Sequence, residues 1–493
     1  MTSVYDFWFS NKKYWIPISQ KDKDHIDKFI AETFPFFEEE IVTTKKYIIG
    51  MIIYHDQFYR HIHRYHKVVD EEFIRKSREK MLPFVDMLNT NELEEEELIF
   101  VLMPLKHLYD YKTVLEKVLE WTKYRNKVVK DFVSLSKFFQ DTYQKMYTLP
   151  YIQKNVKLST FTGFDFDPME VCEKYVEKYE VNSNVFTIQN LDHAIVSLSG
   201  GVDSMTILTL LKNMHTKVTA CHLIYGNREE SWKEFAIVQE FCHKLQVPLY
   251  YYVIEHLKRK EVEREFYERM TRDIRFNLYK SLIKEGESYG VFLGHIQDDV
   301  IENVWTNFAK GQHLFNLQKM EQDSIQEGVR LIRPFLYRTK KEILGMATVP
   351  YLKNTTPAWS NRGKFRTNFY KATHEQFGEM VDERVLEVAK TLEGVGKILE
   401  NTIYKPVLSS FDGFKLNVTR AIEAELGVGE WSYLFEKFCH NHLHTNKPSV
   451  HSIQQFIDRI RKKEWTTLRF HLKKDLEFIL CKDETEFYIK MMY

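Results

Sequence analysis

Residues 193 to 208, HAIVSLSGGVDSMTIL, constrain the fold of this chain more than any other segment. The stretch from His193 to Leu198 is a short apolar run of the length expected for a buried strand. Small residues follow at once, and from Met205 the apolar residues recur with a helical period. A strand, a tight glycine loop and a helix predict an α/β fold with a phosphate cradle. Glycine lets the backbone approach an anion closely, and the start of a helix directs amide groups at it.

The loop itself has the pattern S-G-G-x-D-S, which differs from both the Walker sequence and G-x-G-x-x-G. It resembles the loop of the N-type ATP pyrophosphatases (PP-loop enzymes), which split ATP between its α and β phosphates. The alternative is a plain glycine turn, but six specified residues after a buried strand favour a nucleotide site. The residues that we expect to bind ATP here are Ser199, Gly200, Gly201, Val202, Asp203 and Ser204.

Further apolar runs alternate with helical patterns after this loop. They occupy residues 218 to 225, 249 to 254, 291 to 294 and 329 to 335. With residues 193 to 198 they predict a parallel five-stranded sheet with helices on both faces. In such a sheet ligands bind at the carboxyl ends of the strands, where the strand order reverses.

A second polar motif, GHIQDDVIEN, follows the fourth of these runs. His295 leaves the strand, Asp298 and Asp299 open the next helix, and Glu302 lies one turn further along the same face. Helix capping explains one carboxylate but not the whole set. We therefore interpret the motif as a site for Mg²⁺ and for positioning a substrate.

SGGVDS, GHIQDDVIEN and LIRPFL at residues 331 to 336 together resemble the tRNA(Ile)-lysidine synthetase family. TRDIRF at residues 271 to 276 resembles another segment of that family, and YGNR at residues 225 to 228 stands where the family has a turn. The resemblance covers residues 190 to about 375. It implies an adenine nucleotide alpha hydrolase-like fold and a ligase that forms a carbon–nitrogen bond. The substrates would be ATP, tRNA and an amine, with lysine expected, and the metal Mg²⁺.

The resemblance also implies roles for individual residues. Asp203 with Asp298 or Asp299 would hold Mg²⁺, and His295 would contact ATP. Arg272 and Arg275 would neutralise the charge that develops on the phosphates. Asp299 or Glu302 would hold the ammonium group of the amine. The family usually carries D-x-S-N before R-N-x-x-R, whereas residues 354 to 366 lack the acidic residue and are more closely spaced. The identity of the amine therefore stays open.

Two basic segments are candidates for RNA contact, because Lys+Arg and Asp+Glu both number 70 and any attraction to RNA must be local. The first interleaves cations with aromatic residues, as single-stranded RNA requires. It contains Arg362, Lys364, Phe365 and Arg366. The second is a helix end that could equally be a solvated terminus favoured by the helix dipole. It contains Arg459, Arg461, Lys462 and Lys463.

The five cysteines lie far apart without any C-x-x-C pair, which argues against a disulfide framework and a cysteine-bound cluster. No apolar run is long enough to span a bilayer, and the first residues lack the pattern of a signal peptide. We therefore expect a cytoplasmic protein without membrane contact. Thiolation of tRNA or another adenylate-forming ligation remains the alternative reaction. A non-catalytic helical scaffold with a degenerate nucleotide domain is the alternative outside enzymes.

The length of 493 residues predicts several domains. We expect an all-α domain at 1–150, a linker and helix at 151–190, the catalytic domain at 191–375 and a small α+β domain at 380–493. Proline should end a helix at Pro150 and open one at Pro168, and Asp412-Gly413 should turn a hairpin. The break at Pro150 predicts that residues 1 to 150 fold alone and are dispensable for ATP binding.

The N-terminal region carries three signatures, DFWF at residues 6 to 9, YHDQFYR at 54 to 60 and MPLKH at 103 to 107. Together they resemble an uncharacterised bacterial all-helical family of tetratricopeptide-like hairpins, which implies a fold and no activity. Asp56, Arg60 and His107 could line a polar pocket, but internal pairing is the favoured interpretation. A concave helical face could also recruit a protein partner.

Overall fold

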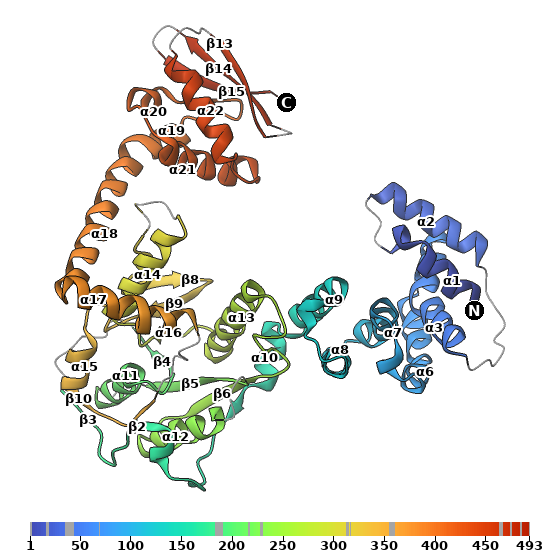
Figure 1. The fold of residues 1–493 in the computed structure, drawn as a ribbon, viewed down its shortest axis with the longest axis horizontal. Coiled ribbons are helices and arrows are strands. Elements are labelled where there is room, and N and C mark those ends of the chain that lie inside the picture. The colour runs from blue at the N-terminus through green and yellow to red at the C-terminus, as the bar shows by residue number, and fades with distance from the viewer. Residues whose placement is uncertain are drawn as a thin grey trace. The chain divides into compact units, whose positions relative to one another are not determined.

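The computed structural model describes residues 2–15, 19–34, 44–68, 70–182, 191–214, 217–226, 230–311, 315, 317–353, 360–462, 467–473, 476–483 and 486–492. The chain divides into two compact units (Figure 1). Unit 1 comprises Met1–Gly294, Ser324–Ile332 and Met346–Lys353. Unit 2 comprises His295–Asp323, Arg333–Gly345 and Asn354–Tyr493. None of the described helices is long and apolar enough to cross a membrane.

A seven-stranded sheet with the order β1-β6-β5-β4-β7-β9-β8 is the centre of unit 1. The five strands from β6 to β9 are parallel, which confirms the predicted sheet. The two edge strands were not predicted, and β1 pairs with β6 in the antiparallel sense. The strands are β1 Lys157–Leu158, β4 His193–Ser197, β5 Val218–Tyr225, β6 Leu249–Ile254, β7 Tyr289–Phe292, β8 Asp323–Gln326 and β9 Val329–Ile332.

The strand order reverses between β4 and β7. The chain runs from β4 outward to β5 and β6, and then returns to β7 on the other side of β4. The connecting helices are α11 Val202–Asn213, α12 Ser231–Lys244 and α13 Arg264–Leu282. Right-handed crossovers place α11 and α12 on one face of the sheet and α13 on the other. The carboxyl ends of β4 and β7 therefore flank the position where α/β sheets bind ligands.

The N-terminal region of unit 1 is all-α, as predicted. Its apolar stripes bury large aromatic side chains such as Trp8, Phe58 and Trp121. Its helices are α1 Thr2–Ser10, α2 Gln20–Thr33, α3 Lys45–Ile53, α4 Tyr59–Tyr65, α5 Glu71–Glu79, α6 Leu82–Met87, α7 Glu95–His107, α8 Tyr111–Tyr124, α9 Val133–Met146 and α10 Leu149–Asn155.

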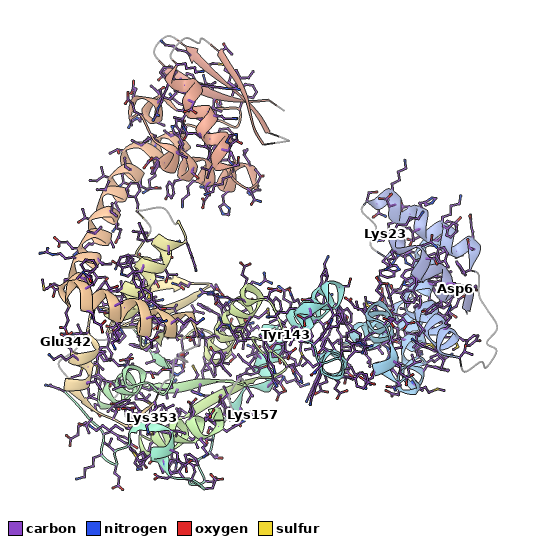
Figure 2. The ribbon with its side chains drawn as sticks, in the orientation of Figure 1. Asp6, Lys23, Tyr143, Lys157, Glu342 and Lys353 are labelled. Carbon is purple, nitrogen blue, oxygen red and sulfur yellow. The ribbon has the colours of Figure 1, made fainter. Side chains whose placement is uncertain are left out.

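The buried core continues from these helices into the sheet. Figure 2 labels Tyr143, a buried residue of α9 that belongs to this core. The hydroxyls of Tyr143 and Tyr147 donate to the carbonyl oxygen of Glu255, at 3.2 and 2.7 Å. Packing therefore crosses residue 150, and the independent folding of residues 1 to 150 stays a prediction. Pro150 lies in the first turn of α10 rather than at a helix end, because proline fits where no amide donor is needed.

Asp56 is completely buried within a π-helical turn, Tyr54–Phe58. Its carboxylate accepts hydrogen bonds from Nε of Arg78 at 2.7 Å and from Nδ1 of His107 at 2.8 Å. Burial alone would raise the pKa of Asp56, but these two partners more than offset it and lower that pKa. The internal pairing expected for Asp56 and His107 is confirmed.

The linker after α10 contains short strands in place of the helix predicted from Pro168. A 3-10 turn, Pro168–Glu170, precedes β2 Cys172–Lys174 and β3 Glu180–Val181. These strands pair with β11 Tyr351–Leu352 and β10 Ala347–Thr348, and this pairing over a long sequence separation overrides the local helical pattern.

Unit 2 ends in the predicted small α+β fold. Strands β13 Thr467–Lys473, β14 Leu476–Asp483 and β15 Glu486–Met492 form an antiparallel sheet. The hairpin expected at Asp412-Gly413 is wrong, because β12 Lys415–Asn417 pairs with β15. The helices of this unit are α14 Gln297–Ala309, α15 Lys340–Met346, α16 Asn361–Lys364, α17 Lys371–Phe377, α18 Met380–Leu399, α19 Lys405–Ser409, α20 Thr419–Glu423, α21 Val428–Phe438 and α22 Val450–Arg461.

Candidate nucleotide and substrate site

The loop after β4 is held in shape by its own serine hydroxyls. Oγ of Ser204 accepts a hydrogen bond from the amide of Ser199 at 3.2 Å and donates to the carbonyl oxygen of Gly201 at 3.1 Å. Oγ of Ser199 accepts from the amide of Gly201 at 3.3 Å. Gly200 has a φ of +80°, which disfavours any residue with a side chain. The loop is thus a compact turn rather than an open connection.

This loop delivers the chain directly into α11. Gly201 precedes the helix and Val202 is its buried first residue, and no side chain caps the helix start. The amide groups of the first turn are therefore donors of the kind that bind an anion at a helix N-terminus. Because β4 lies at the reversal of strand order, the loop lies where the sequence predicts a phosphate site.

Gly294 brings the segment after β7 against the same helix start. A Cβ atom at this position would lie 2.9 Å from the backbone nitrogen of Ser204 and 3.2 Å from Cβ of Asp203. Such contacts are too short for any side chain, so glycine is required here for packing. The sequence motif gave Gly294 no role, and only the close approach of two backbones reveals one.

The two arginines expected to neutralise phosphate charge lie on α13. Nη2 of Arg275 donates a hydrogen bond to the hydroxyl of Tyr225 at 2.7 Å, and this contact orients the guanidinium group. Tyr225 ends β5, whose carboxyl end lies at the same sheet edge as the end of β4. Arg272 instead donates to the carboxylate of Glu327 at 3.0 Å. The structure therefore brings Arg275 to the predicted edge, while Arg272 is paired with the turn between β8 and β9.

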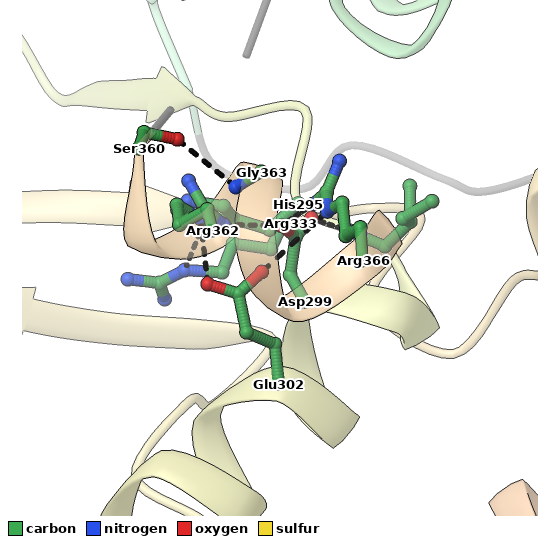
Figure 3. Close-up of polar contacts among 9 residues, drawn as sticks. His295, Asp299, Glu302, Arg333, Ser360, Arg362, Gly363 and Arg366 are labelled. Atoms are coloured by element: carbon green, nitrogen blue, oxygen red, sulfur yellow. Dashed lines mark hydrogen bonds and ion pairs between the residues drawn. The ribbon is translucent and has the colours of Figure 1, made fainter. Parts of the chain in front are cut away.

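Two carboxylates at the start of α14 face two arginines from the segment that begins with α16 (Figure 3). Asp299 and Glu302 are 6% and 8% exposed. Oδ1 of Asp299 accepts from Arg362 and, at 2.9 Å, from Arg366. Oε1 of Glu302 accepts from Nε of Arg362 at 3.0 Å. We call these four residues the acid–arginine cluster.

Asp299 also caps its own helix. Its Oδ2 accepts the amide of Ile296 at 2.9 Å, so its two oxygens serve different purposes. Capping, the alternative considered for the paired aspartates, thus accounts for one oxygen of Asp299 only. The sequence predicts that the two arginines bind RNA and that the two carboxylates bind the amine, but in the structure these residues pair with one another. They lie about 60 residues apart in the sequence, so no local pattern predicts the contact.

Asp298 is distinct from its neighbour. It forms no hydrogen bond or ion pair with any other residue that the structure describes. Burial raises its pKa, nearby Arg366 lowers it, and the charge of Asp299 raises it further, with a net increase. A bound cation would favour the ionised form of Asp298 and so offset the effect of burial. Asp298 is therefore suited to bind a cation.

His295 is oriented by a residue that the sequence motif left without a role. Nε of the buried Arg333 donates to Nδ1 of His295 at 3.2 Å, and its Nη1 donates to the carbonyl oxygen of Glu321 at 2.7 Å. An arginine is always protonated, so Nδ1 of His295 is the acceptor in this contact.

The residues described contain no group of three or more His, Cys, Asp or Glu side chains that could hold a metal ion. Mg²⁺ needs fewer protein ligands, because it is commonly bound by one or two carboxylates together with substrate phosphates. Asp203 and Asp298 fit that chemistry by type. They belong to different units, and a metal site shared between them stays a prediction.

The remaining RNA candidates are partly outside the described residues. Lys364 is exposed, and the ring of Phe365 lies 5.2 Å from that of Phe369. Arg459 and Arg461 lie in the last turn of α22. Part of the YGNR turn, the segment 354–359 and Lys463 lie outside the described part of the chain. RNA contact by these residues stays a prediction.

Cys172 and Cys221 are poor candidates for sulfur chemistry. Burial raises the pKa of Cys172 to about 11 and that of Cys221 to about 12, so both thiols stay protonated at neutral pH. A thiol rather than a thiolate is a weak nucleophile.

Comparison with known proteins supports the central part of this assignment. The PP-loop domain family (ATP_bind_3) matches residues 173–364. A tRNA(Ile)-lysidine synthase of Chlamydia muridarum is 32% identical over 205 residues, 40% of this chain and 62% of that protein. One from Chlamydia felis is 25% identical over 287 residues, 57% of this chain and 89% of that protein.

This chain therefore spans less than two thirds of the first relative's length and most of the second's. Among solved structures, the U34-tRNA thiolase NcsA from Methanococcus maripaludis, with its [4Fe-4S] cluster, has a TM-score of 0.31 and 14% identity over 42% of this chain and 74% of that one. Residues 173–364 of this chain are therefore similar to PP-loop domains, and the chain is similar over part of its length to tRNA(Ile)-lysidine synthases.

Proposed function

We propose that this protein is an ATP-dependent, tRNA-modifying ligase of the cytoplasm. It would transfer AMP from ATP to a cytidine carbonyl oxygen with release of pyrophosphate, and an amine would then bond to the activated carbon as AMP leaves. One observation carries the proposal: an S-G-G-x-D-S loop opens an uncapped helix at the reversal point of a parallel sheet. The similarity of residues 173–364 to PP-loop domains supports the same reaction class.

In this proposal the loop binds the β and γ phosphates of ATP, which leave together as pyrophosphate. The amides at the start of α11 and the hydroxyls of Ser199 and Ser204 donate to phosphate oxygens. Arg275, held by Tyr225, lies at the same sheet edge and neutralises charge that builds up as the base oxygen attacks the α phosphorus. Mg²⁺ would be held by Asp203 and Asp298 and would supply positive charge to the phosphates.

The acid–arginine cluster is the proposed site of the amine substrate. It contains two carboxylates and two guanidinium groups, so that its side chains are neutral in sum. A free amino acid carries the same two kinds of charge. Asp299 and Glu302 would take its ammonium group, and Arg362 and Arg366 would take its carboxylate. This chemistry supports lysine, the amine that the family resemblance implies, as the expected second substrate.

Product analysis tests this function directly. The full chain is incubated with ATP, Mg²⁺, tRNA(Ile) and an amino-acid mixture, and the digested nucleosides are examined by mass spectrometry. We expect AMP and pyrophosphate, together with a cytidine whose mass has increased by lysine less water. Asp203→Asn serves as the inactive control. Formation of ADP and phosphate would show that the pyrophosphatase assignment is wrong.

A further inference from the structure

Two basic segments that are far apart in the sequence meet in unit 1. The amide of Lys130, just after α8, donates to the carbonyl oxygen of Glu261 at 2.8 Å. Glu261 in turn donates its own amide to the carbonyl oxygen of Lys258 at 3.0 Å, which closes a tight turn. These two hydrogen bonds join KYRNKVVK at residues 123 to 130 to KRK at residues 258 to 260.

The joined segments form a strongly positive surface on a chain without net charge. Residues 122 to 131 hold four basic residues and one acidic, and residues 256 to 263 hold three basic and two acidic, so basic residues outnumber acidic ones by seven to three. Arg264, which follows, is paired with Glu268 at 2.7 Å. Two of the three acidic side chains are used locally. Asp131 accepts the amide of Val128 at 3.1 Å, and Glu261 accepts that of Val129 at 3.4 Å.

The lysines of this surface have no acidic partners within the described part of the chain. All are exposed, and none forms an ion pair within 4.0 Å with another described residue. Elsewhere in unit 1 exposed lysines are commonly paired, as Lys12 is with Glu96 and Lys46 with Asp6. These lysines are Lys123, Lys127, Lys130, Lys258 and Lys260, and the ammonium group of Lys127 lies 5.4 Å from the ring centre of Phe132.

An exposed aromatic ring lies within the same segment. Tyr124 is 68% exposed at the end of α8, between Lys123 and Arg125. Arg125 is turned the other way, since its guanidinium lies 3.7 Å from the ring centre of Trp121 and donates to the carbonyl oxygen of Leu93 at 2.7 Å. Unpaired cations beside an exposed ring suit a nucleic acid, whose phosphates bind lysine and whose bases stack on tyrosine.

We propose that this surface, which we call the 123–130/258–260 surface, binds the phosphodiester backbone of the RNA substrate. The inference rests on the proposed function for the existence of that substrate. It adds a contact that the PP-loop domain alone lacks, because residues 123 to 130 lie outside the stretch that matches the family. The N-terminal helical region thus extends the RNA-binding surface.

Salt-dependent binding of full-length protein to tRNA(Ile) tests the inference. The triple variant Lys127→Gln, Lys258→Gln, Lys260→Gln is compared with a control triple, Lys21→Gln, Lys28→Gln, Lys80→Gln. Both variants lose three positive charges from exposed lysines of unit 1, so the net charge of the two proteins is equal. Thermal unfolding and ATP binding verify that each variant is folded.

The surface variant should bind tRNA more weakly, with a plot of log K against log salt that is less steep by about 2 to 3. Each lost phosphate contact reduces that slope by roughly 0.7 to 0.9. The control variant should bind like the unchanged protein. Tyr124→Ala should weaken binding without altering the slope, because stacking is not ionic.

Equal behaviour of the two triple variants would overturn the inference, since only net charge would then matter. Unchanged tRNA binding by the surface variant would overturn the inference as well. If the unchanged protein fails to bind any tRNA, it is the proposed function that fails. The two failures are therefore distinguishable.

Discussion

Adding a single methyl group at Gly294 should be enough to impair the nucleotide loop. A Cβ atom there would lie 2.9 Å from the backbone nitrogen of Ser204, which is one of the amides of the proposed phosphate site. We expect Gly294→Ala to displace the start of α11, to weaken ATP binding at least tenfold and to destabilise the fold by about 1–3 kcal/mol.

Gly345→Ala is the matched control for this substitution. Gly345 lies in α15, and a Cβ atom there meets nothing within 4 Å, so the change should be neutral or slightly stabilising. ATP binding by calorimetry and unfolding by denaturant measure both effects. Full ATP affinity in Gly294→Ala would show that the loop tolerates movement at this point.

Replacing Asp298 with asparagine should increase stability and decrease activity. Its folded-state pKa is raised above the ordinary value of 3.8, so the ionised form destabilises the fold at pH values above that raised pKa. Asp298→Asn should therefore increase the free energy of unfolding at pH 7. The gain should disappear below pH 3.8, where the acid is protonated in both states.

The same variant should lose AMP formation by about 100-fold, because an amide is a poor ligand for the proposed Mg²⁺. Titrating Mg²⁺ in the assay separates weak metal binding from misfolding. A variant that is less stable than the unchanged protein at pH 7 would contradict the burial argument.

At the scale of elements, the acid–arginine cluster links the start of α14 to α16 within unit 2. Arg362→Gln would leave two nearly buried carboxylates with one guanidinium partner. The cost should be about 1–2 kcal/mol, less than for a fully buried pair, because the Arg362 side chain is 46% exposed.

A double-mutant cycle of Arg362→Gln with Glu302→Gln should give a coupling energy of about 1 kcal/mol or more. The exposed pair of Arg384 and Glu387 in α18 provides the control, since both side chains are at least 65% exposed. Its coupling should be at most about 0.5 kcal/mol. Equal coupling in both cycles would mean that the cluster contributes no more than an ordinary surface pair.

Prediction from sequence succeeded where the signal is local. The loop at Ser199, the five parallel strands and the C-terminal antiparallel sheet each follow from patterns within a few residues. It failed at Pro168 and at Asp412, where strands pair with distant partners instead of following local preference. The contact of Arg362 with Asp299 and the role of Gly294 could not be predicted, because both depend on segments brought together only by the fold.

At the scale of the molecule, the N-terminal helices and the sheet share one core within unit 1. A chain that begins at Lys157 would uncover Tyr252, Phe266 and Met270, which are at most 4% exposed. Its free energy of unfolding should fall by about 1.5–3 kcal/mol for each side chain that becomes fully exposed. Denaturant unfolding of the two chains, with ATP binding as a second readout, measures the difference. Equal stability would establish a domain boundary near residue 150.

The short strand β1 bears on the risk of aggregation while the sheet folds. It covers the β6 edge through the pairs Lys157 with Tyr251 and Leu158 with Tyr250. An uncovered β-edge is a template for pairing with other chains, and thus for aggregation. Because residues 157 and 158 leave the ribosome before β6, the covering strand is already present when that edge first forms. The chain order therefore makes β1 available to pair with Tyr250 and Tyr251 as soon as β6 forms.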